Sequence, residues 1–154
     1  MAPLTLAELR AALPRSARLI GLDPGSRVVG VALSDVSLTL ASPYGALKRG
    51  KLAVAAAEVA AIARKEGAGG LVVGLPLGMD GSFGPAAQAA KDWGRALAEA
   101  AGLPVAFWDE RLSSAAVNRA MIEADLSRAK RAERVDAAAA AYMLQAALDA
   151  SRPG

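Results

Sequence analysis

The first apolar segments of the chain are two short runs separated by a turn. The run from Arg18 to Asp23 is followed by Pro24-Gly25, and the run from Val28 to Ser34 is rich in β-branched residues. Short apolar runs bounded by proline and glycine predict β-strands, so we expect these two to form a β-hairpin. A third strand is expected between Leu38 and Leu47, interrupted by Pro43 because proline cannot donate to a sheet ladder.

Helical and strand-like segments then alternate. Lys51 to Glu66 has a helical composition and is stopped by a glycine-rich stretch, after which Leu71 to Leu75 predicts a short buried strand. A glycine-rich loop from Pro76 to Gly84 leads to a helix over Pro85 to Ala101, whose proline suits a first helical turn. Val105 to Trp108 predicts the next strand.

The two ends of the chain are expected to be helical. Leu4 to Leu13 is amphipathic and predicts a short helix or arm within residues 1–16. The C-terminal part predicts a helix over Ser113 to Ala124, a basic link from Leu126 to Arg134, and an alanine-rich helix from Val135 to Asp149. The element order predicts an α/β fold with a mixed five-stranded sheet, an antiparallel meander plus parallel strands, and helices on both faces.

Length and composition limit the possibilities further. A chain of 154 residues, 54% of them hydrophobic, is long enough for one core and too short for two α/β domains, so we expect a single domain over residues 1–154. No apolar stretch reaches the roughly 18 residues that a membrane-spanning helix requires, and the start lacks a signal-peptide pattern. We therefore expect a cytoplasmic protein with no membrane partner.

The chain contains no cysteine and no histidine. This composition excludes thiolate nucleophiles, zinc sites of the Cys/His type and Ser-His-Asp triads. A hydrolase with these residues must use carboxylates, which prefer hard ions such as Mg²⁺ or Mn²⁺. The net charge of +3 is compatible with a polyanionic partner, although many proteins without one share it.

Three acids stand where such chemistry could be placed. Asp23 ends an apolar strand before a turn, Glu110 follows the strand that ends in Trp108-Asp109, and Asp136 lies near the start of an apolar helix. Each has an ordinary interpretation: a turn-starting aspartate, a loop acid neutralised by Arg111, and a helix cap. One metal site explains all three together, because clustered carboxylates hold the ions that activate water for phosphodiester cleavage.

Two segments could contact a phosphate backbone. The loop from Gly74 to Gly84 offers backbone N–H groups and Ser82 beside the strand ends, although a connector without ligand explains it equally well. The basic link carries Arg128, Lys130 and Arg131 directly before Asp136, in a pattern that suits a phosphodiester backbone or a solvated surface.

These motifs, in this order, resemble the YqgF/RuvX family of Holliday-junction-resolvase-like proteins and pre-16S rRNA nucleases. The resemblance spans nearly the whole chain. It rests on four segments: Gly21-Leu22-Asp23-Pro24-Gly25 with Gly30-Val31-Ala32-Leu33-Ser34-Asp35, Val73-Gly74-Leu75-Pro76 with Met79-Asp80-Gly81-Ser82, Trp108-Asp109-Glu110-Arg111-Leu112-Ser113, and Val135-Asp136-Ala137-Ala138-Ala139.

The resemblance implies a ribonuclease H-like fold and assigns Asp23, Glu110 and Asp136 to the family's acidic catalytic triad. The family usually has a basic pair before the glycine equivalent to Gly30, whereas here Arg27 is followed by Val28, so one basic contact is missing. Precursor 16S rRNA ranks first among the implied substrates and a four-way DNA junction second. A junction would favour a homodimer.

Two other function classes remain open at this stage. The acids could hold a structural ion in a non-catalytic nucleic-acid-binding or ribosome-associated module. An ATP-using protein of the actin-like phosphotransferase class also begins with a strand followed by Asp-x-Gly, but it requires two such domains, and this chain has the length of one.

Overall fold

The computed structural model describes residues 2–25, 27–78, 80–110 and 128–153, with side chains of the last range from residue 135 on. The helices and strands follow one another as α1 (Leu6–Ala12), β1 (Arg18–Pro24), β2 (Val28–Ser34), β3 (Ala41–Lys48), α2 (Leu52–Glu66), β4 (Ala68–Leu75), α3 (Pro85–Ala101), β5 (Val105–Asp109) and α5 (Arg128–Ala150). The five strands form one sheet in the order β3-β2-β1-β4-β5.

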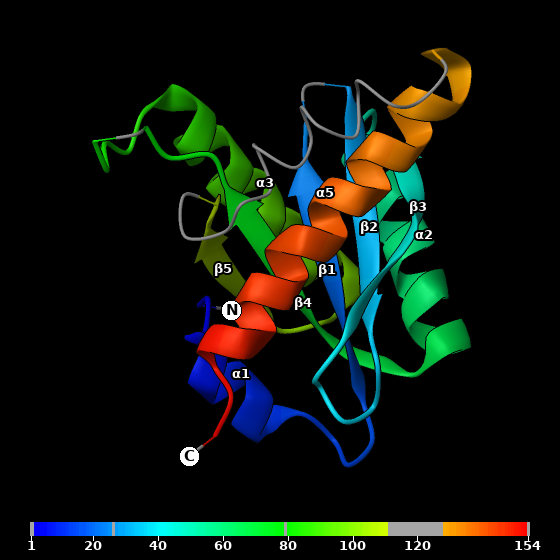
Figure 1. The fold of residues 1–154 in the computed structure, drawn as a ribbon, viewed down its shortest axis with the longest axis vertical. Helices are drawn as coiled ribbons and strands as arrows, with labels where there is room; N and C mark the ends of the chain where they lie inside the picture. Colours follow the sequence, from blue (N-terminus) through cyan, green and yellow to red (C-terminus); the bar gives the residue numbers. More distant parts are fainter. Residues whose placement is uncertain (1, 26, 79, 111–127, 154) are drawn as a thin grey trace.

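The direction of each strand decides which loops meet. β1 is antiparallel to β2, and β2 is antiparallel to β3, so the first three strands form the expected meander. β1 runs parallel to β4, and β4 runs parallel to β5. The carboxyl ends of β1, β4 and β5 therefore lie side by side at one end of the sheet (Figure 1). Ligand sites of open α/β sheets form at such an end.

Helices cover both faces of the sheet (Figure 1), and the central strands β1, β2 and β4 accordingly bury side chains on both sides. One core lies under α2 and α3 and contains Ile20, Leu22 and Val73 of the central strands. The other core lies under α1 and α5, where Leu19 and Val72 pack against alanine, leucine and methionine side chains of α5. The predicted fold class, a mixed five-stranded sheet with helices on both faces, is confirmed.

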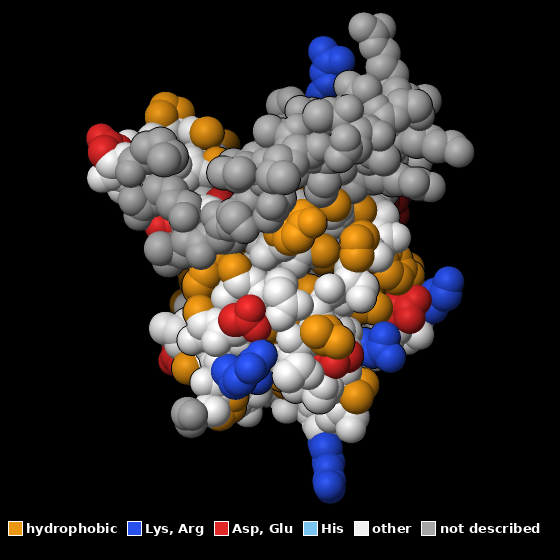
Figure 2. Space-filling view, viewed as in Figure 1, with side chains coloured by type: hydrophobic (Ala, Val, Ile, Leu, Met, Phe, Trp, Pro, Cys, Tyr) orange, Lys and Arg blue, Asp and Glu red, His pale blue; other side chains and the backbone are white. Residues whose placement is uncertain are grey.

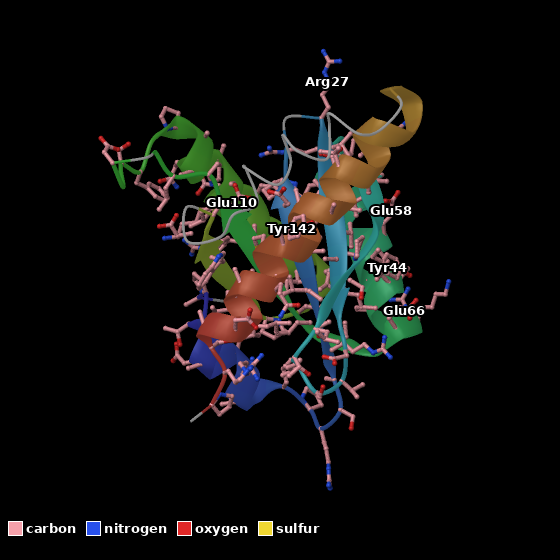
Figure 3. All side chains as sticks on the ribbon, viewed as in Figure 1. Arg27, Tyr44, Glu58, Glu66, Glu110 and Tyr142 are labelled. Atoms are coloured by element: carbon pink, nitrogen blue, oxygen red, sulfur yellow. The ribbon has the colours of Figure 1, made fainter. Side chains whose placement is uncertain are left out.

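The third strand runs through Pro43, contrary to the expected interruption. β3 is an edge strand, where proline is tolerated, and its register against β2 shifts so that Val31 pairs with Gly45 and Ala32 with Pro43. Tyr44 is thereby the extra residue of a bulge. Its hydroxyl donates a hydrogen bond of 2.9 Å to Glu66 Oε2 of α2, and Figure 3 shows these two side chains together.

Two further boundaries differ from the predictions. β4 begins at Ala68, so the expected helix-stopping glycines extend the strand, and only Gly67, with a left-handed φ of 72°, ends α2. α5 begins at Arg128, so most of the predicted basic link is helical. The helix predicted over Ser113 to Ala124 lies outside the described residues.

The short N-terminal helix expected within residues 1–16 is present as α1. Thr5 and Glu8 form a capping box at its start, in which each side chain accepts a hydrogen bond from the other residue's backbone N–H. At its other end, Arg10 donates a hydrogen bond of 3.2 Å to Ser151 Oγ, just beyond α5. The N-terminal segment is thus joined to the C-terminal helix, and it also contacts the sheet directly, because the Leu4 N–H donates a hydrogen bond of 2.9 Å to the carbonyl oxygen of Val105 in β5.

The outer side of α5 carries exposed apolar side chains. Figure 2 shows hydrophobic side chains gathered over this helix, and Tyr142 is 42% exposed there. Tyr142 lines a shallow hollow of about 250 Å³ between α5 and β3 with Ala41, Pro43, Ala138, Ala141 and Gln145.

In the described part of the chain, no helix combines the length and the hydrophobicity needed to cross a membrane.

Candidate active site

Asp23 occupies the carboxyl end of β1, and its side chain faces α5. Gly21, two residues earlier, would place an added Cβ only 2.9 Å from Leu144 Cβ of α5. Side chains two residues apart on a strand share a face, so Asp23 faces the same way. Only 5% of Asp23 is exposed. A buried carboxylate is costly unless it is hydrogen-bonded or paired, so Asp23 must be held by polar partners at this position.

Asp136 reaches the same place because α5 lies directly on β2. Gly30 pairs with Asp23 across the hairpin, and a Cβ on Gly30 would overlap with the backbone carbonyl oxygen of Asp136. Any side chain at Gly30 would therefore push the helix off the sheet. The glycine at this position brings the partly buried Asp136 next to the end of β1.

Glu110 reaches the end of the sheet across β4. A Cβ on Gly74 would lie 2.6 Å from Glu110 Oε1 and 3.0 Å from its Cγ, so the glutamate side chain lies on this glycine. β4 separates β5 from β1 in the sheet, and the side chain therefore extends from β5 towards Asp23. Its Oε1 atom is buried.

The three predicted acids thus share one face and one end of the sheet. All three offer oxygen donors, which suits a hard divalent ion by chemistry. Within the described residues, no group of three or more acidic side chains is arranged closely enough to hold a metal ion as it stands. A metal bound by Asp23, Glu110 and Asp136 accordingly stays a prediction.

The turn after Asp23 is held by an arginine that sequence reasoning missed. Arg49 Nη1 donates a hydrogen bond of 2.8 Å to the carbonyl oxygen of Gly25, and its backbone N–H donates one of 3.0 Å to the carbonyl oxygen of Arg27. Its guanidinium also lies 5.6 Å from the ring centroid of Trp93 in α3. Arg49 therefore connects the turn to the opposite helix layer.

The predicted substrate-binding residues are placed unevenly. Arg27 is exposed and projects from the tip of the β1–β2 turn (Figure 3), and its contact with substrate stays a prediction. Arg128, Lys130 and Arg131 belong to the first turns of α5, but their side chains lie outside the described residues, as does all of Arg111.

Ser82 lies in a compact loop after β4. The N–H of Gly78 donates to the carbonyl oxygen of Ser82 at 3.0 Å, and the N–H of Ser82 donates to Asp80 Oδ1 at 2.9 Å. Ser82 itself is exposed, and α3 begins at Pro85. Phosphate contact by this loop stays a prediction.

Asp35, a further acid of the family-like motifs, has a structural role at the other end of the hairpin. Burial raises its pKa, but hydrogen bonds from the backbone N–H groups of Thr39 and Leu40 and from the hydroxyls of Ser37 and Thr39 outweigh this and lower the pKa to about 2. Asp35 thereby fixes the β2–β3 loop.

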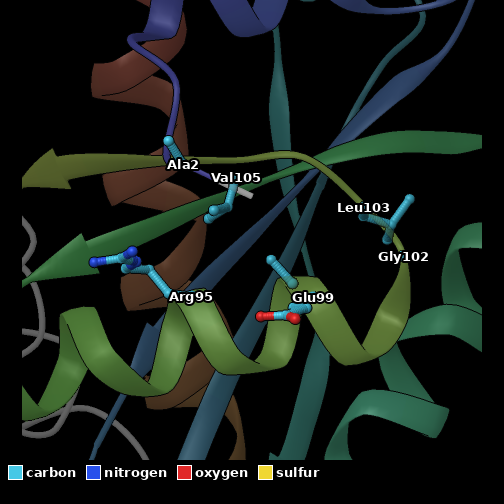
Figure 4. Close-up of a pocket in the computed structure, with 7 residues that line it drawn as sticks. Ala2, Arg95, Glu99, Gly102, Leu103 and Val105 are labelled. Carbon is cyan, nitrogen blue, oxygen red and sulfur yellow. The ribbon is translucent and has the colours of Figure 1, made fainter.

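A hollow of about 220 Å³ lies at the start of β5 (Figure 4). Arg95 and Glu99 of α3 border it with opposite charges, and Val105 forms part of its wall. Glu110 follows the opposite end of the same strand. The hollow is therefore remote from the acidic end of the sheet.

Comparison with known sequences identifies relatives over almost the whole chain. The sequence model of the RuvX family, described as Holliday junction resolvase, matches residues 17–150. A protein of Acidiphilium cryptum named "Putative pre-16S rRNA nuclease" is 72% identical over 144 residues, covering 94% of this chain and 91% of the relative. A protein of Gluconacetobacter diazotrophicus with the same name is 66% identical and covers 94% of each chain.

Solved structures agree on the fold. Thermus thermophilus RuvC in complex with a Holliday junction substrate superposes with a TM-score of 0.53 at 16% identity, over 87% of this chain and 94% of the other. The expected ribonuclease H-like fold is thereby confirmed. With a family match over residues 17–150 and relatives of such high identity, the chain belongs to the RuvX family.

Proposed function

We propose that this chain is a metal-dependent nuclease that hydrolyses phosphodiester bonds in structured nucleic acid. The observation that carries the proposal is the placement of Asp23, Glu110 and Asp136 on one face and at one end of the sheet. Family membership and the names of the relatives agree with a nuclease. We place its activity in the cytoplasm, as expected from the sequence.

The acids would hold one or two divalent cations, Mg²⁺ or Mn²⁺. When bound, such ions activate water and stabilise the leaving oxygen of a phosphodiester. Asp23 would hold its position most firmly, because it is buried within a sheet strand and its turn is tied down by Arg49. The position of the Glu110 carboxylate would depend on the space above Gly74. The position of Asp136 would depend on the contact of α5 with Gly30.

The basic side chains would orient the substrate. Arg27 projects beside the acidic end and would contact a backbone phosphate. We assign the same task to Ser82 in the β4–α3 loop, and to four residues whose side chains lie outside the described part of the chain: Arg111, Arg128, Lys130 and Arg131. These contacts carry no sequence information, so they fit a substrate recognised by its shape.

The 5′ end of precursor 16S rRNA is the first proposed substrate, in line with the names of the relatives. A four-way DNA junction is the second, because the family model is described as a Holliday junction resolvase. One domain over residues 1–154 would carry either activity, since both cores are built on a single sheet. Association into a homodimer or with the ribosome stays a prediction that sedimentation measurements can test.

The test is cleavage of a labelled precursor-16S 5′ leader and of a four-way DNA junction, with Mg²⁺, with Mn²⁺ and with chelator. Asp23→Asn, Glu110→Gln and Asp136→Asn should each lower the rate by about 100-fold or more, with unchanged circular dichroism spectra. Asp149→Asn, on the exposed far part of α5, and Glu58→Gln, on the exposed side of α2, are the matched controls.

The outcomes separate the alternatives. Metal-dependent cutting that is lost in the three variants and kept in both controls supports the proposal. Wild-type rates in all three variants refute it. Binding of both substrates without cleavage under any metal condition identifies a non-catalytic nucleic-acid-binding module instead.

A further inference from the structure

One large aromatic side chain is about half exposed in the loop that follows β4. Phe83, in the loop between β4 and α3, is 46% exposed. Burying a phenylalanine side chain fully contributes roughly 1.5 to 3 kcal/mol to stability. Phe83 is only partly buried, so it contributes only part of this free energy. Figure 2 shows hydrophobic side chains at the projecting corner formed by this loop and the start of α3.

The loop presents Phe83 from a fixed backbone. The N–H of Gly81 donates to the carbonyl oxygen of Gly78 at 2.9 Å, and the N–H of Gly78 donates to the carbonyl oxygen of Ser82 at 3.0 Å. Gly81 adopts a φ of 88°, which closes the turn. Helix α3 begins two residues after Phe83, so the aromatic residue lies between a closed turn and a helix start.

A cation lies against the ring. Lys91 Nζ of α3 is 5.7 Å from the ring centroid of Phe83, within the range of a cation–π contact. The nearby acids of this region accept hydrogen bonds from their own segments: Asp92 from Gln88 Nε2 at 2.8 Å, and Asp80 from the N–H of Ser82. The partly buried Lys91 thus places its ammonium group over the face of the Phe83 ring.

The position of the loop connects this pair to the acids. The loop follows β4, the strand whose Gly74 lies under Glu110. It therefore leaves the sheet at the same end as Asp23 and Glu110. A nucleic acid bound across that end and continuing along this loop would meet Phe83.

We infer that Phe83 and Lys91 form a subsite for one unpaired base and its phosphate. The base would stack on the exposed ring, and the ammonium group would contact the adjoining phosphate, as in proteins that bind single-stranded nucleic acid through aromatic platforms and cations. The inference rests on the proposed function, and it narrows the substrate class to nucleic acid with an unpaired segment next to the cleaved bond.

Binding measurements in the presence of chelator test the subsite without cleavage. The probes are a short single-stranded RNA, the same sequence as DNA, each with 2-aminopurine at successive positions, and a blunt duplex of equal length. Wild type should bind the single strands more tightly than the duplex and change the fluorescence of one 2-aminopurine. Phe83→Ala and Phe83→Leu should weaken single-strand binding roughly 5- to 100-fold, the loss expected for one stacked base.

The variants separate stacking from other contacts. Phe83→Trp should keep the affinity and the fluorescence change, because it preserves an aromatic surface. Lys91→Gln should weaken binding and reduce its salt dependence. Val54→Ala, at another exposed apolar side chain on the distant α2, is the control and should bind as wild type does.

Three results would overturn the subsite: equal affinity of wild type for duplex and single strand, wild-type binding by Phe83→Ala, or wild-type binding by Phe83→Leu with loss in Phe83→Ala. The last would indicate an apolar contact, as with a protein partner. None of these results bears on the proposed nuclease activity, which the cleavage assay tests separately. Conversely, a protein that never cleaves could still show the stacking signature.

Discussion

The two ends of the β1–β2 hairpin each carry a strand-terminal aspartate, and the fold treats them differently. Asp35 follows β2 and accepts four hydrogen bonds from its own loop. Asp23 ends β1 within the sheet, paired with Gly30 and facing α5. Distant parts of the chain, α5 and the residue after β5, converge on Asp23, whereas the hydrogen bonds described for the Asp35 carboxylate come from residues 37–40.

This difference teaches how to interpret an acid after a strand. An aspartate satisfied by residues within five positions organises a turn, whatever motif it belongs to. An aspartate that a helix backbone and a second acid approach from far along the chain is a candidate site residue. The glycines at positions 30 and 74 make that approach possible, because each removes a side chain that would keep the other element away.

The largest expected effect comes from Gly30→Ala. The added methyl group would collide with the Asp136 carbonyl oxygen, which belongs to a helix backbone and cannot rotate away. We expect a loss of about 3 kcal/mol or more in the free energy of unfolding, measured by urea denaturation. Gly45→Ala is the matched control, because a Cβ there meets nothing within 4 Å. Equal unfolding midpoints in both variants would contradict the close contact of α5 with β2.

Gly74→Ala should affect activity more than stability. The new Cβ would displace the Glu110 carboxylate, which can move because it is the end of a flexible side chain. A misplacement of about 1 Å can cost about 100-fold in rate, so we expect kcat to fall roughly 10- to 100-fold. The measurement is cleavage of the better substrate alongside thermal melting. An unchanged kcat would show that Glu110 is not needed in this position.

Asp35→Asn should affect stability more than activity. The variant loses a charged acceptor with four hydrogen bonds, so we expect about 2 kcal/mol less stability at pH 7 and an unchanged kcat. Because the pKa in the folded protein is lowered to about 2, the wild-type advantage is complete above about pH 4 and is lost as the pH falls towards 2. Urea denaturation at pH 7 and pH 3 measures it. A difference that grows towards low pH would have the wrong sign.

Arg49→Ala should have the smallest effect. It removes the hydrogen bond to the Gly25 carbonyl and the contact with the Trp93 ring, which loosens the turn after Asp23. One such hydrogen bond contributes about 1 kcal/mol, so kcat should fall about 5-fold while KM changes less. Arg49→Lys should recover part of the loss, and Lys48→Ala, at an exposed neighbour, should have none. A loss confined to KM would argue for direct substrate contact instead.

The fold was largely predictable, because apolar runs, glycine stops and strand ends are local signals. The errors lie where tertiary structure overrides them. Pro43 is tolerated because β3 is an edge strand with a bulge, which only the sheet order reveals. The first residues of α5 are basic, and their composition is typical of a solvated link. The helix that packs on β2 nevertheless begins at Arg128 and includes them.

The candidate site was predictable in part, because some of its acids follow local strand signals. Asp23 and Glu110 stand at the ends of apolar strands, and parallel strands bring such ends together. The fit of Gly30 beneath α5, the bond from Arg49 to the turn and the exposure of Phe83 depend on segments far apart in sequence. No periodicity or spacing encodes them.

Helix α5 also fixes the number of residues between two of its contacts with the sheet. At one point it rests on Gly30 through Asp136, and nine positions later Gln145 donates to the Thr39 carbonyl oxygen and accepts from the N–H of Ala41. These two anchors are about 13 Å apart along the helix, and one inserted residue would turn one of them by about 100° relative to the other. The spacing of the two anchors along the helix is therefore fixed to the single residue. A change in the chain between these two anchors therefore preserves both contacts only if it keeps the number of residues constant.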